Sequence, residues 1–154
     1  GQLPMQAVNL KNLVQEALQA LQPFAQEKDI HWNLNLEDVV IEANPELMFS
    51  CIRNLGDNAI RYTPSQGRVV IRMVKTPHPQ LLIENSGEGI AADVLERLGE
   101  RFYRALGTRT QGSGLGLSIC QKIMALHAAK IDYAPSDLGG LKVSLSFKPE
   151  SKIS

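Results

Sequence analysis

Three short polar blocks constrain the fold of this chain more than any other feature of its sequence. They read NLGDNAIRYTP, ENSGEGI and GSGLGL, and they lie in this order between Asn54 and Leu117. Each block alone is a weak signal, because asparagines and glycines are common in turns and at helix ends. In this order and at this spacing, they predict a pocket for a nucleotide, its magnesium ion and a mobile lid.

The chain has the size and composition of one domain with an aliphatic core. It has 154 residues, of which 44% are hydrophobic, and a single Trp. Lys plus Arg (16) equals Asp plus Glu (16), which argues against a dedicated nucleic-acid or anionic-membrane surface. No stretch approaches the ~20 apolar residues of a membrane span. We therefore expect a soluble, cytosolic domain that binds no nucleic acid.

The two cysteines, Cys51 and Cys120, fall within runs that predict buried helices. Their spacing is not that of a metal site, and two cysteines do not make a disulfide framework. We expect both thiols to be reduced and to act as small apolar side chains in the core.

The spacing of apolar residues predicts a succession of helices and strands. Helices are expected at 12–27, 45–62 and 115–127, a loop with a short helix at 90–98, and strands at 8–10, 30–36, 39–41, 68–75, 80–84, 130–133 and 140–147. Residues 105–112 are polar and contain glycine, which predicts a mobile segment.

Two helices carry more detailed predictions. Pro23 predicts fraying or a break near the end of the first helix, whose buried side would carry Leu13, Ala17, Leu18, Leu21 and Phe24. The second helix begins at Asn44-Pro45-Glu46. Asn44 is suited to cap it, Pro45 to occupy its first position, and Glu46 to meet its positive end.

The first block places four polar side chains on one face of the second helix. Asn54, Asn58, Arg61 and Tyr62 fall at i, i+4, i+7 and i+8. An Asn carbonyl oxygen is a hard ligand suited to Mg²⁺, an Arg can contact a phosphate, and a Tyr ring can cover a base. A solvated helix face with Tyr62 at its rim remains an alternative.

The second block follows a strand, and its glycines Gly87 and Gly89 allow the backbone to bend sharply and to approach a ligand. Asn85, at the strand end, has the donor and the acceptor needed to pair with an adenine edge. Considered as an isolated motif, the block is typical of an ordinary turn.

The third block, 112–117, opens directly into a helix. Its backbone N–H groups and the positive helix end make an anion site. The block is not a Walker loop, because no Gly-Lys-Ser/Thr follows, and it lacks the preceding strand of a dinucleotide-binding fold. A helix entry with spare glycines is the alternative.

These blocks resemble the N, G1 and G2 boxes of the sensor histidine kinases, whose catalytic domains share an ATP-binding fold with gyrase, Hsp90 and MutL. Residues 99–104, GERFYR, are similar to the intervening F box, in the ERFYR form found in kinases of the QseC kind. The resemblance covers residues 8–147. It implies a Bergerat-type fold, an α/β (α+β) two-layer sandwich in which a mixed β-sheet is covered on one face by three helices.

The resemblance also implies roles for individual residues. Asn58 would hold Mg²⁺ and act in catalysis with Arg61 and Arg104, and residues 104–111 would form the ATP lid. Tyr62 would pack on the adenine and Asn85 would read it. The residues expected to contact ATP are Asn54, Asn58, Arg61, Tyr62, Asn85, Gly87, Gly89, Gly112, Ser113, Gly114, Leu115, Gly116 and Leu117.

This sequence departs from the family pattern at two positions. The G1 box usually begins with Asp, where this chain has Asn85. A charged acceptor would bind the adenine amine about 1 kcal/mol better than an amide does, so we expect weaker nucleotide binding. The F box often carries a second Phe where this chain has Gly99, so we expect Phe102 to anchor the lid alone.

The position one turn before Asn58 argues for slow hydrolysis. Gyrase and Hsp90 relatives place there a Glu that activates water, whereas this chain has Asn54, which cannot act as a base. Phosphoryl transfer itself needs mainly positioning and charge neutralisation. The site is therefore expected to hold ATP for a nucleophile other than water.

None of the three histidines, His31, His78 and His127, lies in the acidic-Arg-Thr-Pro context of the family's phosphoacceptor, so we expect structural or surface roles for them. The resemblance implies a catalytic domain at 8–148, preceded by a linker at 1–7 from a missing dimerisation and phosphoacceptor hairpin, and followed by a tail at 149–154. It implies the cytoplasmic part of a bacterial inner-membrane receptor kinase.

The expected activity is transfer of the γ-phosphoryl group of ATP to a histidine of that separate dimerisation domain in two-component signalling. The expected partners are the dimerisation domain and a cognate response regulator. We expect the isolated domain to be a monomer and the full-length protein a homodimer. The alternatives are a degenerate, nucleotide-regulated interaction module and a serine kinase of the anti-sigma type or a stand-alone ATPase.

Overall fold

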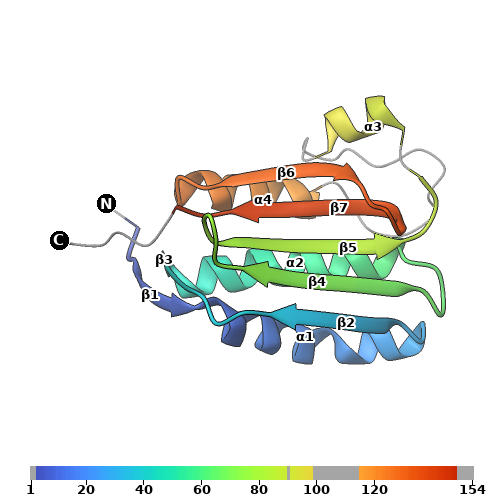
Figure 1. Ribbon diagram of the computed structural model, residues 1–154, viewed down its shortest axis with the longest axis horizontal. Helices are drawn as coiled ribbons and strands as arrows, with labels where there is room; N and C mark the ends of the chain where they lie inside the picture. Colours follow the sequence, from blue (N-terminus) through green and yellow to red (C-terminus); the bar gives the residue numbers. More distant parts are fainter. Residues whose placement is uncertain (1–2, 90, 99–114, 149–154) are drawn as a thin grey trace.

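The computed structural model describes residues 3–89, 91–98 and 115–148. Its main feature is a five-stranded sheet in the order β2-β4-β5-β7-β6 (Figure 1). The strands are β2 (His31–Leu36), β4 (Arg68–Val74), β5 (Gln80–Ser86), β6 (Lys130–Pro135) and β7 (Gly139–Ser146). β2 and β4 are parallel and the other neighbours are antiparallel, so the predicted mixed sheet is confirmed.

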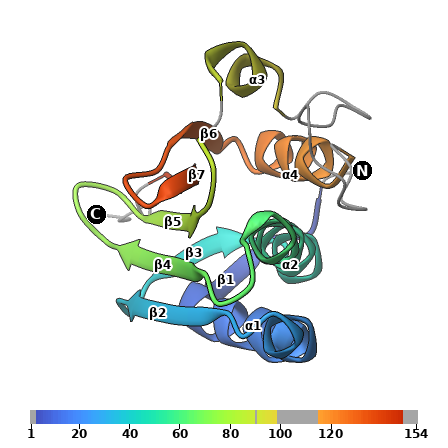
Figure 2. The same cartoon turned by 90° about the vertical axis from the view of Figure 1, so that its right-hand side faces the viewer.

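Three helices cover one face of this sheet (Figure 2). They are α1 (Leu10–Glu27), α2 (Pro45–Tyr62) and α4 (Leu115–Leu126). α2 lies in the middle and contacts α1 on one side and α4 on the other. The predicted two-layer sandwich is therefore confirmed. A short helix, α3 (Ala92–Arg97), lies apart from this layer.

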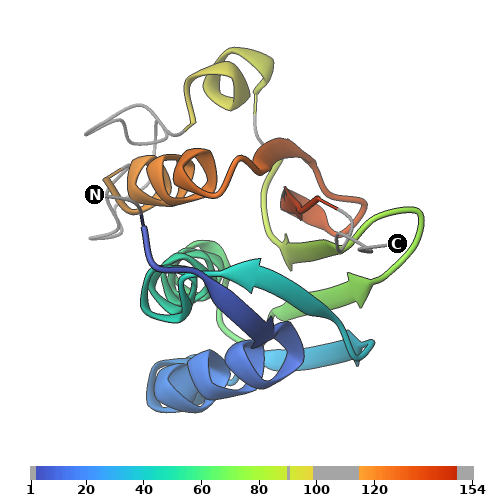
Figure 3. The same ribbon diagram turned by 90° about the vertical axis from the view of Figure 1, so that its left-hand side faces the viewer.

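A small two-stranded ribbon leads into α2 (Figure 3). It pairs β1 (Gln6–Asn9) with β3 (Val40–Ala43) in antiparallel register. β1 begins at Gln6, two residues before the domain boundary expected from the sequence, because its pairing with β3 extends as far as Ala43. Asn44 then caps α2 as predicted, and its side-chain oxygen accepts a hydrogen bond from the Leu47 N–H at 3.0 Å.

The predicted break at Pro23 is wrong, because α1 continues through it to Glu27. A proline inside a helix removes the hydrogen bond to the carbonyl four residues earlier, here that of Gln19. Both residues lie on the exposed side of α1, where water can replace this bond. The expectation that Phe24 is buried is also wrong, since its side chain is 49% exposed.

The core lies between the helices and the sheet. Apolar side chains alternate inward along β4 and β5 and meet the inner faces of the helices. The largest fully buried ones include Leu10, Met48, Ile71, Met73, Leu81, Met124 and Leu145. Across the part of the chain that the structure describes, no helix combines the length and the apolar character needed to cross a membrane.

Cys51 and Cys120 are free thiols buried between α2 and α4, as predicted. The Cys120 Sγ lies 3.4 Å from the Cys51 carbonyl oxygen, to which it donates. A hydrogen bond with the neighbouring Cys51 side chain, together with burial, raises the pKa of the Cys120 thiol far above its ordinary value. The Cys120 thiol is therefore protonated at neutral pH, and both cysteines pack as small apolar side chains in the core.

Candidate functional site

The predicted site residues gather at the end of the molecule where α2 and β5 end and where α4 begins (right-hand side of Figure 1). The side chains of Asn54, Asn58, Arg61 and Tyr62 are all half-buried on α2. The helix runs unbroken from Pro45 to Tyr62, so the face predicted from the i, i+4, i+7 and i+8 spacing exists.

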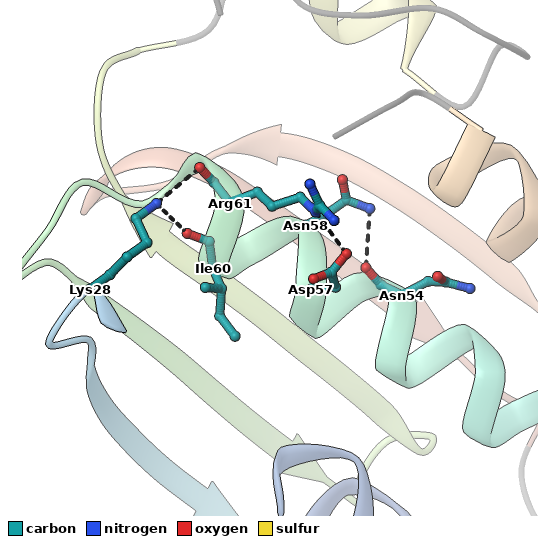
Figure 4. Close-up of polar contacts among 6 residues, drawn as sticks. All are labelled: Lys28, Asn54, Asp57, Asn58, Ile60 and Arg61. Carbon is teal, nitrogen blue, oxygen red and sulfur yellow. Dashed lines mark hydrogen bonds and ion pairs between the residues drawn. The ribbon is translucent and has the colours of Figure 1, made fainter. Parts of the chain in front are cut away.

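The two asparagines of this face are oriented by the helix itself (Figure 4). Asn58 Nδ2 donates to the Asn54 backbone carbonyl at 3.1 Å, and Asn54 Nδ2 lies 3.5 Å from Ser50 Oγ, to which it donates. Because the nitrogen of Asn58 is committed to the backbone, its carbonyl oxygen is the atom that can meet a cation.

Arg61 forms an ion pair one turn back along α2. Its Nε donates to Asp57 Oδ2 at 2.8 Å, and Figure 4 shows the guanidinium lying beside Asn58. The two side chains are 39% and 34% exposed, so water weakens the pair. Asp57 was not among the residues expected at the site, although its i, i+4 spacing from Arg61 is a readable signal.

Lys28 is a second residue that was not expected here. It lies just after α1, and its ammonium donates to the carbonyls of Ile60 at 2.7 Å and of Arg61 at 3.1 Å (Figure 4). Partial burial lowers the pKa of Lys28 from its ordinary value. These contacts join segments more than 30 residues apart, and no local pattern in the sequence predicts them.

The end of β5 lies against the end of α2. A Cβ placed on Gly87, whose φ is +149°, would lie 3.3 Å from the Tyr62 carbonyl oxygen. Ser86 Oγ also accepts a hydrogen bond from the Arg68 N–H at 2.8 Å, and Arg68 begins β4 shortly after α2 ends. The structure thus brings the first two sequence blocks together.

Asn85 is only 5% exposed, and both of its polar atoms have partners within the protein. Its Nδ2 donates to the Ser86 carbonyl at 2.8 Å, and its Oδ1 accepts from the Leu141 N–H at 3.2 Å. Turning the amide over would set donor against donor and acceptor against acceptor, so these partners fix its orientation. Each atom keeps one further hydrogen or lone pair for a ligand.

Two glycines of β7 allow its backbone to approach the end of β5 at Asn85 and the following Gly87. A Cβ on Gly140 would lie 2.5 Å from the Asn85 backbone oxygen and 2.7 Å from its Nδ2. A Cβ on Gly139, whose φ is +109°, would lie 2.5 Å from the Gly87 oxygen. Neither glycine was expected at the site, although a Gly-Gly pair at the start of a strand is a signal of close backbone approach.

The remaining site predictions fall partly outside the described residues. Arg104, the lid, the F box, Gly112, Ser113 and Gly114 lie there. Leu115, Gly116 and Leu117 form the first turn of α4, and Leu117 is buried in the core. Gly89 lies in an exposed turn after β5.

Comparison with known proteins decides the family. The profile described as "Histidine kinase-, DNA gyrase B-, and HSP90-like ATPase" matches residues 43–151, a range that begins at the end of β3 and includes α2, β5 and α4. The chain belongs to this family.

Curated sensor kinases are similar to this histidine kinase-like ATPase domain. The sensor protein QseC of Escherichia coli O157:H7 is 34% identical over 142 residues, which are 91% of this chain and 31% of that protein. The sensor protein kinase PmrB of Pseudomonas aeruginosa is 35% identical over 148 residues, or 94% and 31%. The chain thus spans about a third of the length of these relatives, and it carries the ATPase domain of sensor histidine kinases.

Solved structures share the fold. The nucleotide-free catalytic domain of histidine kinase ThkA superposes with a TM-score of 0.84 at 27% identity, covering 95% of this chain and 96% of that one. The cytoplasmic segment of histidine kinase QseC gives a TM-score of 0.72 at 22% identity, covering 95% and 79%.

The histidines of the ATPase domain have different surroundings. His127, after α4, accepts a hydrogen bond at Nε2 from the Asn44 N–H at 3.0 Å, and its Nδ1 lies 2.7 Å from the Ile123 carbonyl. With both ring nitrogens engaged, His127 ties α4 to the start of α2, as its expected structural role requires. His31 is exposed at the start of β2, and His78 is half-buried in the turn between β4 and β5.

Proposed function

We propose that this domain binds ATP with Mg²⁺ and transfers the γ-phosphoryl group to a histidine of a separate dimerisation domain. In this step the histidine nitrogen forms a bond to the γ-phosphorus, the bond from that phosphorus to the bridging oxygen breaks, and ADP leaves. The main support is the juxtaposition of the Asn54–Tyr62 face with the end of β5 in a histidine kinase-like ATPase domain.

We assign Mg²⁺ to Asn58, because its carbonyl oxygen remains available while its nitrogen is bonded to the Asn54 carbonyl. A hard cation suits an amide oxygen, and Mg²⁺ typically takes only one or two protein ligands together with phosphates and water. Bound there, the ion would supply charge neutralisation at the phosphates. The donor set of the helix face therefore fits the metal.

Arg61 and Arg104 are assigned to the phosphates, with Asn54. Arg61 would exchange its exposed ion pair with Asp57 for a phosphate oxygen, which costs little because exposed pairs of this kind contribute ~0–1 kcal/mol. Tyr62 is assigned to the face of the adenine and Asn85 to its edge. Gly112, Gly114 and Gly116 are assigned to the lid hinge and the phosphate contact.

Asn54 stands where a water-activating carboxylate would be needed. An amide does not take a proton from water, so hydrolysis lacks its general base and ATP persists for the histidine nucleophile. We propose that the residues before β1 link this domain to a dimerisation and phosphoacceptor hairpin, since Gln6 and Ala7 of the expected linker 1–7 pair with β3. We further propose a cytoplasmic location in a homodimeric receptor kinase that acts on a response regulator, with the isolated domain a monomer.

The test is phosphorylation in trans. The domain is mixed with Mg²⁺, γ-labelled ATP and a purified dimerisation hairpin from a sensor kinase of the same family, and the label on the hairpin is followed. We expect phosphate that is labile in acid and stable in base, and none on a hairpin whose acceptor histidine is replaced by Ala. Acid-stable phosphate on a serine would instead identify a serine kinase.

One observation favours a second candidate, a nucleotide-regulated interaction module. Asn85 is almost fully buried and has both polar atoms bonded within the protein, which is also what a structural asparagine requires. Calorimetric titration with a non-hydrolysable ATP analogue, with and without Mg²⁺, separates the two candidates. Magnesium-enhanced binding together with transfer supports the kinase, whereas binding without transfer supports the module.

A further inference from the structure

We infer that Lys28 is a positioning residue of the nucleotide site, which holds the last turn of α2 in place and thereby fixes Arg61 and Tyr62. The inference rests on the proposed function, because that function assigns Arg61 and Tyr62 to the nucleotide. Lys28 itself follows the end of α1. Its ammonium meets the backbone carbonyls of the last turn of α2, whereas the Arg61 side chain extends from that turn in the other direction (Figure 4).

The backbone of the last turn needs partners from outside the helix. The final four carbonyls of any α-helix lack intrahelical donors, and in α2 they belong to Ala59, Ile60, Arg61 and Tyr62. Thr63 serves the first two, because its Oγ1 donates to the Ala59 oxygen and its N–H to the Ile60 oxygen at 3.3 Å.

Lys28 serves the second and third of these carbonyls. Its Nζ donates to the Ile60 oxygen at 2.7 Å and to the Arg61 oxygen at 3.1 Å. One ammonium carries three donors on a single atom, so it can serve two neighbouring carbonyls at once. A positive charge at the C-terminal end of a helix is also favoured by the helix dipole. A side chain without donors would leave the Arg61 carbonyl half-buried and without this bond.

Lys28 is itself fixed on both sides. Its N–H donates to the Ala25 oxygen at 3.2 Å, and its carbonyl accepts from the Gln66 N–H at 2.7 Å. Backbone and side chain together therefore join three segments: the end of α1, the end of α2 and the turn that follows α2. Movement of the last turn would displace the Arg61–Asp57 ion pair and the Tyr62 ring together.

The test compares four proteins by calorimetric titration with a non-hydrolysable ATP analogue and Mg²⁺, at a temperature well below unfolding. They are the parent, Lys28→Met, Lys28→Arg and the control Lys75→Met. Lys75 is exposed and follows β4, at the other end of the sheet from the site (Figure 1). We expect Lys28→Met to bind at least tenfold more weakly, and Lys28→Arg and Lys75→Met to bind within about threefold of the parent.

A second comparison tests whether Lys28 acts through the last turn. In an Arg61→Ala background, Lys28→Met should weaken binding less than it does in the parent, because part of what it positions is already gone. If Lys28→Met lowers only the unfolding temperature and leaves the affinity of the folded domain unchanged, the inference is overturned. If Lys28→Met does not fold, Lys28→Ser, whose side chain is too short to reach either carbonyl, is measured instead; an affinity equal to that of the parent overturns the inference.

The same titrations distinguish a failure of the proposed function from a failure of this inference. If neither the parent nor Lys75→Met binds the analogue, the nucleotide site itself is refuted, and the inference falls with it. If both bind and Lys28→Met binds equally well, only the positioning role is refuted.

Discussion

The side-chain nitrogen of Asn58 is hydrogen-bonded to the helix backbone, and its side-chain oxygen remains available to a ligand. Its Nδ2 is bonded to the Asn54 carbonyl at 3.1 Å, so the side chain keeps its rotamer before any ligand arrives. A ligand atom held in this way loses little conformational entropy on binding, in contrast to a freely rotating side chain.

Replacing Asn58 by Ala should abolish the magnesium-dependent part of nucleotide binding and the phosphoryl transfer. The measurement is the same titration with and without Mg²⁺, followed by transfer to the acceptor hairpin. Asn35→Ala is the matched control, because Asn35 is exposed on β2. Unchanged transfer by Asn58→Ala would show that the metal role belongs to another residue.

Asn85→Asp should change affinity and stability in opposite directions. A carboxylate accepts more strongly from the adenine amine, by about 1 kcal/mol or roughly fivefold in Kd. In the unliganded protein it would set an oxygen where Nδ2 now lies 2.8 Å from the Ser86 carbonyl, and loss of this bond costs about 1 kcal/mol of unfolding free energy.

Titration and urea unfolding of Asn85→Asp measure these two effects separately. Lower stability without tighter binding would show that Asn85 is structural and does not contact the base. Tighter binding with unchanged stability would show that the amide contact with Ser86 contributes nothing to folding.

At the scale of the elements, β5 and β7 approach each other unusually closely beside Asn85. A Cβ on Gly140 would meet backbone and amide atoms of Asn85 at 2.5 and 2.7 Å, whereas the nearest atom to a Cβ on Gly89 is 4.0 Å away. Strands held by ladder hydrogen bonds cannot move apart locally without losing those bonds.

We therefore expect Gly140→Ala to lower the free energy of unfolding by about 1–3 kcal/mol, and Gly89→Ala to leave it nearly unchanged. Urea unfolding monitored by circular dichroism measures both variants. Equal stability of the two would mean that the strands can separate at Gly140 without cost. Nucleotide affinity of Gly140→Ala should fall as well, because the displaced strand carries the Leu141 N–H that orients Asn85.

The sequence predicts elements whose signals are local. The Asn44 cap and Pro45 give the start of α2, and the Thr63-Pro64 stop gives its end at Tyr62. The same helical periodicity places Asn54 and Asn58 on one face. Signals of this kind depend on the nearest few residues, which is why they survive without knowledge of the tertiary structure.

What the sequence does not predict depends on distant contacts. The bond from Lys28 to Ile60 and that from Leu141 to Asn85 span 32 and 56 residues, and periodicity contains no information about such pairs. Pro23 is the opposite case. Its local signal is a helix break, but packing of α1 against α2 outweighs the loss of one hydrogen bond on the exposed side.

At the scale of the whole molecule, the layer of three helices encloses the two thiols. Cys51 and Cys120 are both fully buried where α2 meets α4. The hydrogen bond with Cys51 and burial raise the pKa of Cys120, and the thiolate is the form that reacts with disulfides. Because both thiols are buried, their reaction with a disulfide reagent requires the helix layer to open.

The folded domain should accordingly show almost no reaction with an aromatic disulfide reagent at pH 8 within minutes, and two thiols per chain after denaturation in urea. If a nucleotide stabilises the folded state, it should slow the residual reaction further, because binding reduces the population of the open form. Rapid modification of one thiol in the native protein would contradict the burial of this pair.

α2 is fastened at both of its ends by other helices. His127, after α4, accepts the Asn44 N–H at the start, and Lys28, after α1, holds the carbonyls at the finish. A helix held at both ends keeps fixed spacings between its side chains. Asn54, Asn58 and Tyr62 stand on it at equal intervals of about 6 Å, and these intervals cannot stretch. A ligand therefore has to match the spacing of these three side chains, because the helix cannot change that spacing to suit the ligand.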